Sequence, residues 1–159
     1  MGTISLITGP RNSGKTKFCQ RCVVRARACG WRVTGILTRG AWHNGEKLAL
    51  YARDLGVGEE RLLAQRKSAR EPWEFIGETL EWGNGIFARA VPTDLLVVDE
   101  LGPLEWLEGR GWTAAFGAID SGQYRVALVV VRPELIAQAQ RRWPHALRLD
   151  CSTCRRHGE

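Results

Sequence analysis

The sequence predicts an α/β protein in which helices flank a mainly parallel β-sheet. Short apolar runs at residues 3–8, 94–98 and 125–131 alternate with segments of helical periodicity, a pattern typical of parallel strands buried on both faces. The pair Asn44-Gly45 predicts a β-hairpin after the second strand. A chain of 159 residues, 44% of them hydrophobic, favours one domain, which we place at residues 1–150, with 151–159 as a C-terminal tail.

Glycine-containing turns separate the elements in the first half of the chain. Gly30 is suited to cap the first helix at its C-terminus, and the hairpin turn falls at 42–46. Residues 55–71 have no clear periodicity, so we expect mostly loop there, with room for a short strand or turn. The expected elements are a strand at 3–8, a helix at 15–29, and strands at 31–38 and 47–54.

Prolines mark the helix starts in the second half. Pro72 predicts the start of a helix, and Gly83-Asn84-Gly85 predicts a break or kink within it. The helical face would contain Ile76, Leu80 and Phe87. The remaining expected elements are a strand at 94–98, a helix at 111–121, a strand at 125–131, a helix from Pro133 and a weak strand at 146–149.

The first strand leads into a candidate phosphate-binding loop. Its sequence, Gly9-Pro10-Arg11-Asn12-Ser13-Gly14-Lys15-Thr16, matches G-x-x-x-x-G-K-[ST] between a strand and a helix. Backbone N–H groups of such a loop, with the positive end of the following helix, bind phosphate oxygens. Lys15 could then reach the β- and γ-phosphates of a nucleotide, and the Thr16 hydroxyl could bind Mg²⁺. A chance match is the alternative, and the flanking strand and helix count against it.

A second segment supplies the acids that such a loop needs. Leu95-Leu96-Val97-Val98-Asp99-Glu100 has the form of a Walker B segment, an apolar strand that ends in carboxylates. Ligands of open α/β sheets bind at the carboxyl ends of the strands. We therefore expect Asp99 to complete the Mg²⁺ site with Thr16, and Glu100 to accept a proton from an attacking water.

Together these segments resemble the THEP1-type nucleoside-triphosphatases. The resemblance rests on Gly9–Thr16, Gly35-Ile36-Leu37-Thr38-Arg39 and Asp99-Glu100-Leu101-Gly102-Pro103-Leu104-Glu105. It implies a P-loop NTPase core in which strand 125–131 lies between the phosphate-loop and Walker B strands. It also implies Mg²⁺-dependent hydrolysis of ATP, GTP and other nucleoside triphosphates. The chain departs from the family pattern where Thr38 directly precedes Arg39, without an acidic residue between them, and where Arg11-Asn12 replaces the more usual Pro-Gly.

The expected reaction is in-line attack of water on the γ-phosphoryl group. Loop amides and Lys15 would stabilise the developing charge, and Glu100 would position the water. Arg132 follows strand 125–131 and is the first candidate for a γ-phosphate contact, with Arg39 and Arg11 next. The expected catalytic residues are therefore Lys15, Glu100 and Arg132.

Two alternative functions would use the same loop. A small-molecule or nucleotide kinase would transfer phosphate to an acceptor, but the sequence shows no clear arginine-bearing lid segment. A low-turnover nucleotide-binding switch, acting with nucleic acid, would have no need of a base at Glu100. Hydrolysis is the interpretation that uses both Asp99 and Glu100.

Composition says less about partners and location. The net charge is +6, but the basic residues are scattered, so nucleic acid stays open as a partner without being favoured. No apolar run approaches the ~20 residues of a membrane helix, the expected location is the cytoplasm, and nothing indicates an oligomeric state. Cys151, Cys154 and His157 could ligate zinc, but a closed structural site has four ligands, and a metal-free tail is favoured.

Overall fold

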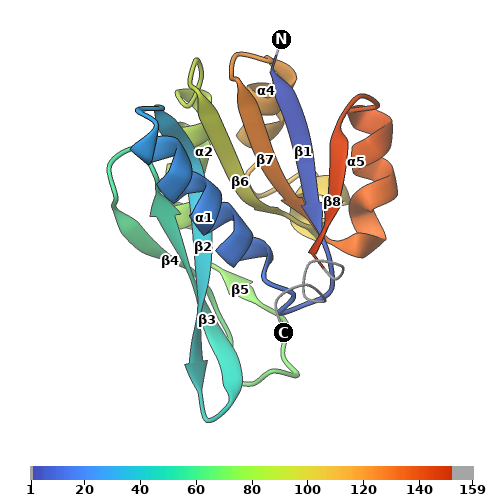
Figure 1. Cartoon of the computed structure of the whole chain (residues 1–159). Coiled ribbons are helices and arrows are strands. Elements are labelled where there is room, and N and C mark those ends of the chain that lie inside the picture. Colours follow the sequence, from blue (N-terminus) through green and yellow to red (C-terminus); the bar gives the residue numbers. More distant parts are fainter. Residues whose placement is uncertain (1, 152–159) are drawn as a thin grey trace, which may run out of the picture.

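A mixed sheet runs through the molecule in the order β5-β4-β3-β2-β6-β7-β1-β8 (Figure 1). The structure, a computed structural model, describes residues 2–151. The strands are β1 (Thr3–Thr8), β2 (Val33–His43), β3 (Glu46–Asp54), β4 (Glu60–Gln65), β5 (Glu74–Phe75), β6 (Leu95–Leu101), β7 (Val126–Val131) and β8 (Leu147–Asp150).

Strands β2, β6, β7, β1 and β8 pair in parallel, whereas β3, β4 and β5 extend the sheet in antiparallel pairs. Strand β7 lies between β1 and β6, where the resemblance places it. The predicted α/β class and the mainly parallel core are therefore confirmed.

Helices cover both faces of the sheet. Helix α1 (Lys15–Ala28) lies in front of β2 and β6 in Figure 1, and α2 (Gly77–Ala88) and α4 (Ala114–Asp120) lie behind the sheet. Helix α5 (Ile136–Arg142), preceded by the 3-10 turn η1 (Pro133–Leu135), packs against β1. A short helix α3 (Pro103–Trp106) follows β6. None of the helices in residues 2–151 has the length and apolar character needed to cross a membrane.

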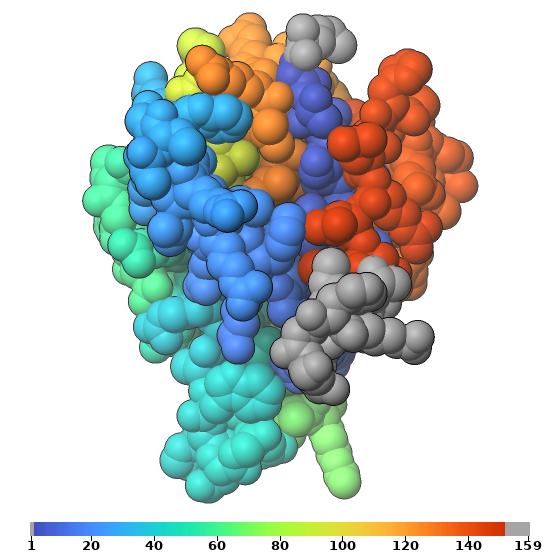
Figure 2. Space-filling view, in the orientation of Figure 1, coloured from blue at the N-terminus to red at the C-terminus, as the bar shows by residue number. Residues whose placement is uncertain are grey.

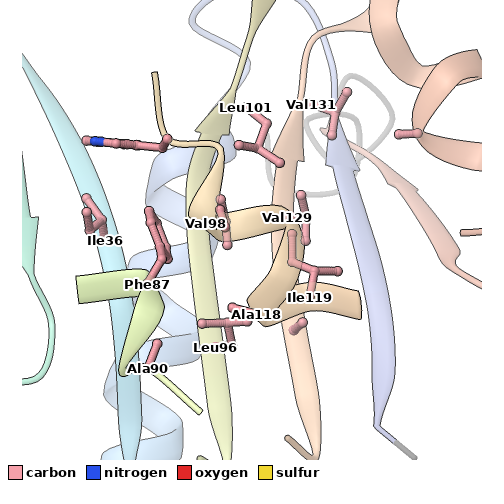
Figure 3. Packing of buried hydrophobic residues seen from close by; sticks show 14 of the residues in the cluster. Ile36, Phe87, Ala90, Leu96, Val98, Leu101, Ala118, Ile119, Val129 and Val131 are labelled. Atoms are coloured by element: carbon pink, nitrogen blue, oxygen red, sulfur yellow. The ribbon is translucent and has the colours of Figure 1, made fainter. Parts of the chain in front are cut away.

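Alternating strand residues form two cores, one on each face. On β6, Leu96 and Val98 pack with α2 and α4, as Figure 3 shows, whereas Leu95 and Val97 pack under α1. This period of two follows from the strand geometry. It has a functional consequence, because Asp99 continues the Leu95–Val97 row and so lies on the α1 face.

The predicted hairpin joins β2 to β3. Asn44 and Gly45 occupy its turn with φ of 49° and 78°, the left-handed conformation that the Asn-Gly pair adopts readily. Strand β2 is longer than expected, because its second half leaves β6 and pairs only with β3. The hairpin thus projects beyond the sheet at the end where the loop after β1 lies, as the cyan projection in Figure 2 shows.

The segment expected to be mostly loop contains the short strand β4, which pairs with β3, and β5 then precedes the helix. The expected start of that helix is wrong. Helix α2 starts at Gly77 rather than at Pro72, and the hydroxyl of Thr79, in its first turn, donates to the Leu62 carbonyl at 2.6 Å.

Helix α2 also runs through Gly83-Asn84-Gly85 without a break. A Cβ on Gly83 would lie 2.2 Å from the Trp112 Nε1, so this glycine allows close packing. The Asn84 side chain donates to the Gly111 carbonyl at 2.9 Å and accepts from the Ala114 N–H at 3.0 Å. Tertiary contacts therefore override the local signal for a break. The helix predicted at 111–121 is the shorter α4.

Candidate functional site

The loop between β1 and α1 curls around its own backbone N–H groups. Gly9, Asn12 and Gly14 have φ of 143°, 58° and 92°, values that permit the tight turns of a phosphate-binding loop. A Cβ on Gly9 would lie 2.7 Å from the Ser13 Oγ. The Lys15 Nζ donates to the Gly9 carbonyl at 2.6 Å, so its ammonium lies against the loop.

The loop residues differ in exposure. Pro10 and Arg11 are exposed, whereas Ser13 is buried. Within residues 2–151, the buried Ser13 Oγ and Thr8 Oγ1 have no hydrogen-bond partner. Such buried polar atoms are rare in folded proteins, and here they lie at the base of the loop.

Asp99 lies beneath the start of α1, as its place in the strand requires. Its Oδ2 accepts hydrogen bonds from the Thr16 hydroxyl at 2.9 Å, the Thr38 N–H at 3.2 Å and the Thr38 hydroxyl at 3.3 Å. Asp99 as a whole residue is 2% exposed. Burial, and then the neighbouring charge of Glu100, raise the pKa of Asp99 to about 6. The structure thus brings together Thr16 and Asp99, which the sequence assigned to one metal site.

The donor set around Asp99 suits a hard cation. Mg²⁺ prefers oxygen ligands, and the site offers a hydroxyl and a carboxylate within hydrogen-bonding distance of each other. Among the described residues, the hydrogen-bond donors to Asp99 Oδ2 are the Thr16 hydroxyl and the Thr38 N–H and hydroxyl, which carry no charge. A buried carboxylate is costly without a compensating charge, so a bound divalent cation would stabilise its ionised form.

Glu100 and Arg132 form an ion pair beside Asp99. The Arg132 Nε donates to Glu100 Oε1 at 3.0 Å, and each side chain is 30% exposed. Glu100 belongs to β6, and Arg132 immediately follows β7. Both side chains therefore lie at the carboxyl ends of adjacent parallel strands, at the edge where the loop after β1 also lies.

The other two arginines proposed for phosphate contact lie in different settings. Arg39 pairs with Glu60 at 2.7 Å and stacks over the Tyr51 ring, 4.4 Å from its centroid. Arg11 is exposed on the loop itself. The structure brings Arg132 to the acids, whereas Arg39 is held by residues of β3 and β4.

Sequence reasoning assigned no role in the site to Thr38 and none to Glu105. Glu105 accepts from the Gly102 N–H at 2.9 Å and the Trp112 N–H at 3.1 Å, and burial raises its pKa. Gly111 leaves room for this carboxylate, because a Cβ there would overlap Glu105 Oε2. Glu105 therefore fixes the chain that follows β6. Thr38 could have been found, because it stands near the carboxyl end of the β2 segment that pairs with β6.

Of the three candidate zinc ligands in the tail, Cys154 and His157 lie outside the described residues. Cys151 is buried, and its Cβ would lie 3.5 Å from a Cβ on Gly9. Residues 2–151 contain no group of side chains arranged to hold a metal through His, Cys, Asp and Glu alone.

The fold is that of a P-loop NTPase. It has a glycine loop at the end of β1, a buried acid at the end of β6 and strand β7 between these two strands. A family model described as NTPase matches residues 5–144, and the chain belongs to this NTPase family. Among curated proteins, nucleoside-triphosphatase THEP1 of Thermococcus kodakarensis is 31% identical over 132 residues, covering 77% of this chain and 73% of that protein. THEP1 of Thermofilum pendens is 31% identical over 130 residues, covering 78% and 71%.

Two solved structures share the fold at low identity. The crystal structure of THEP1 from Aquifex aeolicus aligns with a TM-score of 0.74 and 17% identity, covering 98% of this chain and 94% of that chain. The solution structure of a human cancer-related nucleoside triphosphatase aligns with a TM-score of 0.71 and 16% identity, covering 94% and 88%.

Proposed function

We propose that this chain is a Mg²⁺-dependent nucleoside-triphosphatase that hydrolyses ATP, GTP and related nucleotides to the diphosphate and phosphate. The observation that carries the proposal is the 2.9 Å hydrogen bond between Thr16 and Asp99. It joins the phosphate loop to the acidic strand, as a shared metal site requires. Family membership supports hydrolysis as the reaction.

Each residue has a distinct task in this proposal. The backbone N–H groups of Gly9–Thr16 bind the phosphate oxygens, and Lys15 leaves the Gly9 carbonyl to contact the β- and γ-phosphates. Thr16 and Asp99 would hold Mg²⁺, which neutralises charge on the β- and γ-phosphate oxygens when bound. Glu100 orients the attacking water and accepts its proton.

Arg132 controls Glu100 and also reaches the phosphate side. In the free protein its Nε occupies one oxygen of Glu100. A bound γ-phosphate would compete for this guanidinium and release the carboxylate to accept a proton. Arg132 then stabilises charge that grows in the transition state.

The free thiols of Cys19, Cys22 and Cys29 support a reducing compartment and hence a cytoplasmic location. Nucleic acid is not assigned as a partner. The sequence alternatives, a kinase and a low-turnover switch, remain outcomes of the test below.

The test is a panel of nucleoside triphosphates assayed for free phosphate, with Mg²⁺ and with EDTA. The proposal expects Mg²⁺-dependent phosphate release without an acceptor, and a loss of roughly 10²-fold or more with Lys15→Ala. Lys17→Ala, which removes an exposed lysine of α1, is the control. Phosphate transfer only when an acceptor is added would instead identify a kinase. Binding with negligible turnover would identify a switch.

A further inference from the structure

Lys47, on strand β3 of the hairpin, is a candidate for a further residue of the site that contains Asp99 and Glu100. Lys47 stands opposite Trp42 in the β2–β3 ladder, and the register shifts between Ala41 and Trp42. Such a bulge redirects the side chains near it. The function described above assigns no role to Lys47.

Gly40 provides the path for this side chain. A Cβ on Gly40 would lie 2.7 Å from Lys47 Cε and 2.9 Å from its Cδ, so the aliphatic stem crosses the strand where no side chain stands. Gly40 is two residues beyond Thr38, whose hydroxyl and N–H bind Asp99. The stem therefore lies along β2 close to the metal site.

Two further contacts hold the lysine. The Arg66 Nε donates to the Lys47 carbonyl at 2.9 Å, which fixes the backbone. The Lys47 Nζ lies 5.4 Å from the centroid of the Trp42 ring, within the range of a cation–π contact.

The charged groups that act on Lys47 include residues of the candidate nucleotide site. Burial lowers the pKa of Lys47, the negative charges of Glu100 and Asp99 raise it, and the positive charges of Arg66 and Arg11 lower it. The charges of both acids and of the phosphate loop thus act on this ammonium. Within residues 2–151, the Lys47 Nζ makes no hydrogen bond and no ion pair. A half-buried ammonium with free donors is suited to an anionic ligand.

We propose that Lys47 is a cation supplied in cis, which contacts the γ-phosphoryl group of the bound nucleotide. This inference rests on the proposed triphosphatase function and adds a residue to it. Strands β3 and β7 lie on opposite sides of β6 in the sheet. Lys47 and Arg132 therefore approach the group attacked by water from opposite sides of Glu100.

The test compares nucleotides that differ only in the γ-phosphate. Lys47→Met keeps the aliphatic stem over Gly40 and removes the charge, Lys47→Arg keeps the charge, and Lys67→Met removes an exposed lysine elsewhere. Affinities for a non-hydrolysable triphosphate and for the diphosphate are measured by calorimetry with Mg²⁺. We expect Lys47→Met to lower the ratio of triphosphate to diphosphate affinity by about 10- to 100-fold, the range for a lost charge-assisted hydrogen bond.

The controls separate this contact from a structural role. Lys47→Arg should keep most of the ratio, Lys67→Met should keep all of it, and urea unfolding should show that each variant folds. An unchanged ratio in Lys47→Met, or an equal loss of both affinities, would overturn the assignment of Lys47. The triphosphatase function itself is tested separately: if Lys15→Ala binds and hydrolyses normally, that function fails whatever Lys47 does.

Discussion

Arg132 and Glu100 form a 3.0 Å ion pair between neighbouring strands. The pair holds the candidate base in position before nucleotide arrives, and it also occupies one of the oxygens that would receive the proton. Substrate binding that draws Arg132 toward the γ-phosphate would free this oxygen as well. The first two predictions concern the two members of this ion pair.

Replacing Glu100 should separate binding from turnover. Glu100→Gln keeps the shape and the Arg132 contact but cannot accept a proton as a carboxylate does. We expect nucleotide affinity within a few-fold of wild type and a turnover number lower by about 10²–10⁴-fold, measured by single-turnover phosphate release. Glu108→Gln, in an exposed ion pair with Arg110, is the control. Normal turnover in Glu100→Gln would remove Glu100 from the mechanism.

Arg132 should affect the reaction more than ground-state binding of the diphosphate. Arg132→Ala removes the cation from Glu100 and from the γ-phosphate side, so we expect turnover to fall by about 10²-fold, as for other lost transition-state donors. Diphosphate affinity should change little. Arg125→Ala, at the opposite end of β7 in an exposed pair with Asp94, should hydrolyse normally. Equal activity of the two variants would contradict the role of Arg132.

The buried Asp99 should make stability depend on pH in the metal-free protein. Its folded-state pKa, about 6, lies above the ordinary value of 3.8, so between these values the folded chain holds a proton that the unfolded chain releases. This carboxyl therefore favours the folded state most at low pH, and the stability falls as pH rises from about 4 to about 6. Asp99→Asn removes the effect and should be more stable than wild type at pH 7 by on the order of 1–3 kcal/mol.

Urea unfolding in EDTA from pH 4 to pH 7 checks this expectation for Asp99. The relevant quantity is the difference between wild type and Asp99→Asn at each pH, because other carboxyl groups cancel in it. A difference that stays constant across the range would show that Asp99 titrates normally in the folded protein.

Two glycines of helix α2 should respond oppositely to alanine. Gly83→Ala places a methyl group 2.2 Å from the Trp112 Nε1, which forces α2 and α4 apart and should cost about 1–3 kcal/mol of unfolding free energy. Gly85→Ala meets only the end of the flexible Arg89 side chain, at 3.2 Å, and should be neutral or stabilising by up to about 1 kcal/mol. Thermal unfolding of the two variants gives the comparison. A similar loss of unfolding free energy in both variants would mean that the contact with Trp112 does not determine the effect of Gly83→Ala.

Sequence patterns predicted the parts of the fold where local chemistry and tertiary structure agree. Continuous apolar runs indicated the central strands, because both faces of β6 and β7 are buried. The Asn44-Gly45 turn indicated the hairpin, and the confirmed resemblance to the NTPase family gave β7 its place between β1 and β6. The sequence allowed a short strand within residues 55–71 but did not locate β4, since its mixed residues form a strand through pairing with β3, which is a non-local interaction.

The candidate site divides in the same way. Lys15, Thr16, Asp99 and Glu100 stand in motifs whose spacing is visible in the chain, although their roles stay predictions. Thr38 stands on β2 and reaches Asp99 only because the sheet places β2 beside β6. The role proposed for Lys47 likewise depends on the place of β3 next to β2. The spacing of residues in the sequence does not show which strands are neighbours in the sheet. The cytoplasmic location and the tail at 151–159 also stay predictions.

The position of β7 has a consequence for how the protein is made. The loop after β1 and the acid at the end of β6 are not on adjacent strands, since β7 separates them by about 4.8 Å on each side. A nascent chain that ends before residue 126 contains both motifs but lacks the strand that sets their separation. Nucleotide would therefore bind only after β7 has inserted between strands already made, and ligand binding would then select fully assembled molecules.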